Sequence, residues 1–140
     1  MLITALTLDK LDEFTASQIN PIILAYIGDS VQSIYIRTKL ILHSSKKAKI
    51  LHDLSSSVVN ASSQAKAYEN LAKELTQSED AIFKRARNCK NRQGSKSSSV
   101  NEYRKATGFE AVLGYLYLTG QTERLNYILD KSSVKLDDIT

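Results

Sequence analysis

One long apolar segment, which begins at Asn20-Pro21 and runs to about Leu42, constrains the fold of this chain more than any other feature. Asn followed by Pro is a typical helix start, because the Asn side chain caps the first turn and Pro fits within it. From Ile22 the first half of the segment is apolar on all sides, which predicts a helix buried at the centre of the domain. We therefore expect a fold built around this helix.

The remaining sequence is also helical in pattern. Apolar residues recur at three- and four-residue spacing, and no segment has the clean alternation or the Asn-Gly and Asp-Gly turns of a hairpin. We predict further helices over about 48–54, 58–75, 78–90, 100–118 (closed by Gly120) and 121–129, with a positively charged loop over 91–99. The sequence thus predicts an all-α fold of about six to seven helices in a single domain over residues 1–140.

Composition excludes several classes of protein. The 140 residues include one cysteine, Cys89, which cannot form an internal disulfide and suits a reducing compartment. No apolar run reaches the ~18 residues of a membrane span, and the first residues lack the basic character of a targeting segment. We expect a cytoplasmic protein with no membrane association.

Positive charge is concentrated in one part of the chain. Residues 84–105 contain eight bases and one acid, so they carry +7, whereas the rest of the chain carries −3 of the overall +4. Either a solvated helix face with its loop or a nucleic-acid contact explains this pattern. If nucleic acid binds here, Tyr103 is a further candidate contact, and the candidate phosphate-binding bases are Lys84, Arg85, Arg87, Lys90, Arg104 and Lys105.

Two acids occur where an apolar helix would not be expected to hold them. Asp29 follows Gly28 within the long apolar segment, and Glu110 lies in a second apolar stretch, from Gly108 to Leu118. A buried carboxylate is costly unless it is paired or bound to a metal, so each acid either pairs with a base or caps a helix, or the two converge. Converging carboxylates are suitable ligands for a hard cation such as Mg²⁺, which can activate water against a phosphodiester.

Other chemistry has little support. The two histidines, His43 and His52, are nine residues apart and have no cysteine or histidine at zinc-binding spacing. No glycine-rich phosphate loop can be written anywhere in the chain.

Two segments resemble the ribonuclease III family. Residues 24–37, with Gly28-Asp29 at their centre, resemble its signature helix, and residues 107–118, with Glu110, resemble its second catalytic helix. The chain is more narrowly similar to the Mini-ribonuclease III branch, which has no separate RNA-binding domain. Shorter segments in the same order and spacing support this: Leu51-His52, Ser63-Gln64-Ala65, residues 84–88 and Tyr103-Arg104. The resemblance covers about residues 20–129.

The resemblance implies a homodimeric endoribonuclease that hydrolyses double-stranded RNA with Mg²⁺ bound by Asp29 and Glu110. Each protomer would cut one strand, leaving a 5′-phosphate, a 3′-hydroxyl and a short 3′ overhang, and the branch acts on the precursor of large-subunit (23S) ribosomal RNA. The exposed half of the Asp29 helix is the candidate dimer interface. The alternative is a non-catalytic helical module, for RNA binding or ribosome assembly, with the same fold.

The chain departs from the broader family at two acidic positions. Ala25 and Thr107 stand where full-length ribonuclease III enzymes carry acids, and His52 stands near a further one. Both replacements are expected of the Mini branch. They leave Asp29 and Glu110 as the expected protein ligands, so water or phosphate must supply more of the coordination, and we expect a structural role for His52.

Overall fold

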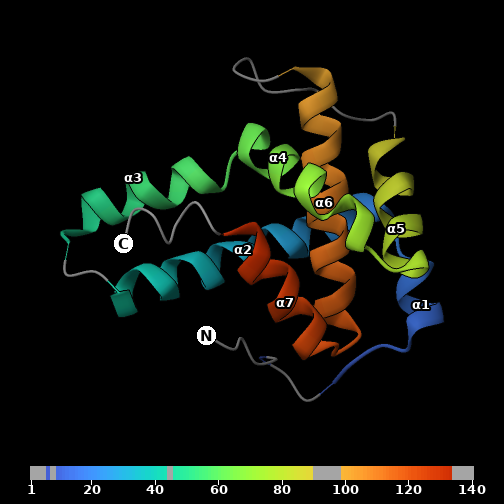
Figure 1. Ribbon diagram of the computed structural model, residues 1–140. Helices are drawn as coiled ribbons and strands as arrows, with labels where there is room; N and C mark the ends of the chain where they lie inside the picture. Colours follow the sequence, from blue (N-terminus) through green and yellow to red (C-terminus); the bar gives the residue numbers. More distant parts are fainter. Residues whose placement is uncertain (1–5, 7–8, 44–45, 90–98, 134–140) are drawn as a thin grey trace.

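The computed structural model describes Leu6 and residues 9–43, 46–89 and 99–133, and these residues form helices and no strand (Figure 1). In chain order they are α1 (Glu13–Ser17), α2 (Pro21–His43), α3 (Ala48–Val58), α4 (Ala61–Leu71), the 3-10 turn η1 (Ala72–Glu74), α5 (Gln77–Arg87), α6 (Val100–Leu118) and α7 (Thr122–Ser132). The predicted all-α fold is confirmed. Position 90 and the predicted loop over 91–99 lie outside the described residues, apart from Ser99.

Helices α2 and α6 form the centre of the fold. They cross each other, and α4, α5 and α7 pack around α6, whereas the far half of α2 extends to the left beside α3 (Figure 1). Every residue of α6 from 106 to 116 is buried except Glu110. The expectation of burial on all sides therefore fits α6 and is wrong for α2, whose Ile23 and Tyr26 are 57% and 77% exposed.

Local sequence sets both ends of α6, and the predicted bounds are confirmed. At its start Ser99 and Glu102 form a capping box, in which each side chain accepts a hydrogen bond from the other residue's backbone N–H. At its end Gly120 adopts a left-handed conformation (φ 69°), and its N–H and that of Gln121 donate to the carbonyls of Tyr117 and Leu116. This double bond pattern is the Schellman motif, which favours glycine.

Several boundaries differ from those predicted. Helix α5 begins at Gln77 because Thr76 caps it in a second capping box, and it ends at Arg87, before Lys90. The predicted helix over 58–75 is divided at Asn60. The Asn60 amide donates to the carbonyls that end α3, and its Oδ1 accepts from the Ser63 N–H that begins α4.

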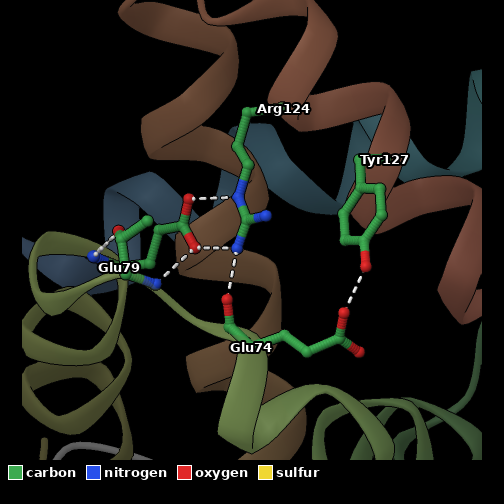
Figure 2. A network of polar contacts seen from close by, with 5 residues as sticks. Glu74, Glu79, Arg124 and Tyr127 are labelled. Atoms are coloured by element: carbon green, nitrogen blue, oxygen red, sulfur yellow. Dashed lines mark hydrogen bonds and ion pairs between the residues drawn. The ribbon is translucent and has the colours of Figure 1, made fainter.

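A polar network attaches α7 to η1 and to the start of α5 (Figure 2). Arg124 donates from Nε and Nη2 to the two carboxylate oxygens of Glu79, at 2.8 Å each, and from Nη2 to the carbonyl of Glu74. The hydroxyl of Tyr127 donates to the Glu74 carboxylate. Burial would raise the pKa of Glu79, but hydrogen bonds from Arg124 and Thr76 outweigh it and hold this pKa below its ordinary value.

Among the described helices, none has the length and apolar content needed to cross a membrane.

Candidate active site

Asp29 and Glu110 lie together where α2 crosses α6. Asp29 is exposed, Glu110 is half-buried, and their carboxyl groups are close enough to share a hydrogen bond. The structure therefore favours convergence of the two acids over pairing of each with its own base, and it brings both predicted ligands to one place.

Two glycines allow the close helix crossing that brings the acids together. A Cβ at Gly28 would lie 1.8 Å from the carbonyl oxygen of Glu110, and one at Gly114 would lie 1.9 Å from the carbonyl oxygen of Leu24. Any larger residue at either position would push the helices apart. Because Gly28 precedes Asp29 and contacts the backbone of Glu110, the tightest point of the crossing is also the point where the acids meet.

The acids border an open cleft of about 800 Å³. Its walls come from α2, from the α3–α4 junction with the start of α4, and from one face of α6. Ala25 and Thr107, which replace acids of the broader family, both line it. The Thr107 hydroxyl donates to the Tyr103 carbonyl within its own helix at 3.0 Å. The other lining residues are Ile22, Tyr26, Val59, Asn60, Ala61, Ser62, Gln64, Tyr103 and Ala106.

The electrostatics of the cleft depend on Glu110. Burial, a hydrogen bond with Asp29 and the negative charge of Asp29 raise the pKa of Glu110 to about 9, while a hydrogen bond from Gln64 acts in the opposite direction. Without a cation, Glu110 therefore keeps a proton at neutral pH. A bound divalent cation would replace that proton, because ligand carboxylates must be ionised.

The donor set of the cleft suits a cation that takes few protein ligands. Within the part of the chain that the structure describes, no three His, Cys, Asp or Glu residues lie together as metal ligands. Two carboxylates on an open cleft fit Mg²⁺, which keeps several waters and substrate oxygens in its coordination shell. They do not fit structural zinc, which requires four enclosing nitrogen or sulfur ligands. His52 lies instead by a smaller cavity between α2 and α3.

None of the described basic candidates lines the cleft, and Arg85 lines a separate cavity between α1 and α5. Lys84 pairs with Asp80 at 2.7 Å on α5, and Lys105 pairs with Glu69 at 2.8 Å on α4. Arg85 donates to the Ser17 carbonyl, and the Arg87 guanidinium lies 5.7 Å from the ring centre of Phe83. Arg104 is exposed. Lys90 lies outside the described residues, and RNA binding by this set remains a prediction.

The sequence analysis assigned no function to Gln64, which forms part of the cleft wall and contacts Glu110. The sequence offered one signal, the spacing that puts Gln64 on the same helix face as Ala61, Ala65 and Tyr68. In the structure this position is buried, with Gln64 only 4% exposed. A long polar side chain at a core position indicates that a polar partner lies inside the fold.

Comparison of this chain with known proteins identifies a matching family and several relatives. The Ribonuclease III domain family matches residues 23–121. The chain is 43% identical over 114 residues to Mini-ribonuclease 3 of Thermoanaerobacter sp., covering 81% of this chain and 80% of that protein. It is 42% identical over 115 residues to the Mini-ribonuclease 3 of Staphylococcus aureus, covering 81% and 86%. A crystal structure of a Fusobacterium nucleatum protein superposes with a TM-score of 0.76 at 28% identity, over 88% of this chain and 96% of the other.

Proposed function

Because this chain belongs to the ribonuclease III family of endoribonucleases, in the Mini-ribonuclease III branch, we propose that it hydrolyses double-stranded RNA with Mg²⁺ bound by Asp29 and Glu110. The observation that carries this proposal is the meeting of the two carboxyl groups on an open cleft at the α2–α6 crossing. Elsewhere α6 is buried from 106 to 116, so a carboxyl group at position 110 is costly for the fold and needs a functional reason.

The side chains of the cleft divide the mechanism between them. Asp29 on α2 and Glu110 on α6 would hold the cation, and Glu110 would bind it as the ionised carboxylate. A cation held there would supply positive charge that activates the attacking water and offsets negative charge on the scissile phosphate. The α2–α6 crossing fixes both carboxylates on rigid helices, so the attacking group and the phosphate meet in one orientation. We expect cleavage to leave a 5′-phosphate and a 3′-hydroxyl.

We propose that the protein acts as a homodimer with one site per protomer. Support comes from an apolar surface on α2, formed by Ile23, Tyr26, Ile34, Ile41 and Leu42, which are 43–77% exposed. An apolar surface of this kind on a soluble domain is typical of a protein interface. A two-fold axis would place two sites on the two antiparallel strands of a duplex, giving a short 3′ overhang.

The proposed substrate is the precursor of 23S ribosomal RNA, which places the protein in the cytoplasm. A-form RNA presents its phosphates and 2′-hydroxyls on a wide, shallow groove, so we expect recognition by shape and charge. The basic residues Lys84, Arg85, Arg87, Lys90, Arg104 and Lys105 are the proposed phosphate contacts.

A cleavage assay on a long perfect RNA duplex tests the function. We expect wild-type protein to cut with Mg²⁺ and not with EDTA, and Asp29→Asn to bind the duplex without cutting it. Glu123→Gln, an exposed acid on α7, serves as the matched control and should cut normally. Cleavage by Asp29→Asn at the wild-type rate would contradict the metal site. Binding without cleavage by the wild-type protein, on the duplex and on ribosomal precursor RNA, would support the non-catalytic alternative.

A further inference from the structure

Two glutamines are buried beside the candidate active site. Gln32 on α2 and Gln64 on α4 are 2% and 4% exposed, and Nε2 of Gln64 donates to Oε1 of Gln32 at 2.7 Å. Burying an amide is costly unless its hydrogen-bonding groups find partners. Packing alone would be served better by Leu or Met at either position, so the pair needs a reason besides core filling.

The Gln64 amide also reaches Glu110. Nε2 of Gln64 carries two protons and donates one to Gln32. Gln64 also lines the cleft beside Glu110, and a hydrogen bond from its side chain favours the ionised form of that carboxyl group. Once a cation has replaced the Glu110 proton, the carboxylate can only accept hydrogen bonds, so the second Nε2 proton of Gln64 is the group that can bind it. The oxygen of Gln32 accepts the other proton and so keeps the Gln64 amide from rotating away.

The three side chains join the helices that form the cleft. Gln32 lies one turn beyond Asp29 on α2, Gln64 projects from α4, and Glu110 projects from α6. The hydrogen-bonded series therefore links the helix that carries one acid to the side chain of the other acid. The two side chains that support Glu110 in this series are neutral amides. A Lys or Arg in place of Gln64 would orient Glu110 equally well but would repel an incoming cation.

We propose that Gln64 is a positioning residue of the nuclease, whose amide is held by Gln32 and in turn orients the Glu110 carboxylate toward the cation. This inference rests on the proposed function, since it assigns a role to Gln64 at the same metal site. Groups that orient metal ligands in this way commonly change metal affinity by about 10- to 100-fold when removed. A residue that only satisfied the core would change stability and leave cation affinity unaltered.

The test measures cation binding directly, without RNA. Mn²⁺ binds the same oxygen ligands as Mg²⁺, and the free ion is quantified by its electron paramagnetic resonance signal. We expect Gln64→Met, which keeps the length of the side chain and removes both donors, to raise the Mn²⁺ dissociation constant about 10- to 100-fold. The Mg²⁺ concentration for half-maximal cleavage should rise by a similar factor, with most of the rate recovered at saturating Mg²⁺.

Two further variants separate positioning from stability. Gln32→Met should weaken Mn²⁺ binding less than Gln64→Met does, and it should add no loss of affinity in the double variant, because Gln32 acts through Gln64. Tyr115→Phe is the matched control on α6. It removes a buried hydroxyl that donates to Glu13 at 3.0 Å, so it should lower stability without changing Mn²⁺ affinity.

The outcomes distinguish this inference from the proposed function. If wild-type protein binds Mn²⁺ and folded Gln64→Met binds it equally well, the positioning role is wrong and the nuclease assignment stands. If Gln64→Met does not fold, Gln32→Met decides, and wild-type affinity in that variant overturns the proposal. If wild-type protein does not bind Mn²⁺, the proposed metal site is wrong and the positioning role falls with it.

Discussion

Replacing Glu110 by Gln is expected to stabilise the protein in the absence of a cation while removing its response to Mg²⁺. Burial and the neighbouring Asp29 raise the pKa of Glu110 to about 9, compared with an ordinary value of 4.5. At pH 7 the side chain is therefore protonated in the folded protein and ionised in the unfolded chain. Gln has the shape of protonated Glu and carries no charge at any pH.

The direction and size of the effect follow from proton linkage. Between pH values of about 4.5 and 9 the folded protein binds the extra proton, so its stability falls as pH rises. One proton corresponds to about 1.4 kcal/mol per pH unit at most. Because Glu110 borders an open cleft, screening by solvent lowers its folded-state pKa and narrows this pH window, so we expect about half of the limiting value of about 2.8 kcal/mol, or about 1.4 kcal/mol, between pH 6 and pH 8. A loss of that size lowers the Tm of a domain of this length by about 5 °C.

Thermal unfolding followed by circular dichroism, at pH 6, 7 and 8 with EDTA or Mg²⁺, measures the effect. With EDTA, the fall in Tm from pH 6 to pH 8 should be about 5 °C smaller in Glu110→Gln than in wild type, and the variant should melt higher at pH 8. Mg²⁺ should raise the Tm of wild type at pH 8 and leave that of the variant unchanged, because a ligand stabilises only the state that binds it. Equal pH slopes in the two proteins would refute the argument, since Glu110 would then be ionised in the fold. Glu123→Gln is the control for loss of an exposed acid.

The remaining predictions concern the helix crossing, the buried ion pair and the basic residues. Gly28→Ala places a methyl group 1.8 Å from the Glu110 carbonyl oxygen. The clash should lower the stability of the fold by more than the about 1 kcal/mol that a Gly-to-Ala change gains in an ordinary helix, and it should lower Mn²⁺ affinity. An unchanged Tm and affinity would contradict the close crossing. Glu79→Gln should lower stability at pH 7 but not in acid. The pKa of Glu79 is depressed, so its contribution to the stability of the wild type is lost as pH falls below the ordinary value of 4.5. The variant should therefore be less stable than wild type at pH 7 and approach it at pH 3, as measured by urea unfolding. Replacing Lys84, Arg85 and Arg87 together by Ala should weaken duplex binding and reduce its salt dependence by up to about three phosphate contacts in a titration with KCl. An unchanged slope would exclude these residues from the interface.

The structure bears out the parts of the fold that short sequence signals determine. Helix α6 has its predicted bounds because its caps, Ser99 with Glu102 and then Gly120, are contained in a few consecutive residues. The break at Asn60 was not predicted because the apolar spacing continues across it, and only the Asn60 side chain distinguishes two helices from one. Helix α1 was missed because it has five residues and buries only Ala16.

The candidate site divides in the same way. Asp29 and Glu110 could be identified from the sequence alone because a carboxylate within an apolar helix is unusual. Their meeting depends on a helix contact between residues about eighty positions apart, which spacing alone does not determine. The role of Gln64 depends on a partner 32 residues away, and the ion pair of Lys105 with Glu69 spans 36 residues. Such pairings become visible only once the helices are placed.

The glycine crossing also has a mechanical consequence. Helices α2 and α6 have 23 and 19 residues, so they are about 35 and 29 Å long at 1.5 Å per residue. Their backbones touch beside Asp29 and at Glu110 itself, so this contact is the natural pivot for any tilt of one helix against the other. A displacement at a pivot is small even where the ends of the levers move by several ångströms. A tilt of α2 about this contact would therefore move the outer half of α2 and its neighbour α3 much further than it would move the two carboxylates.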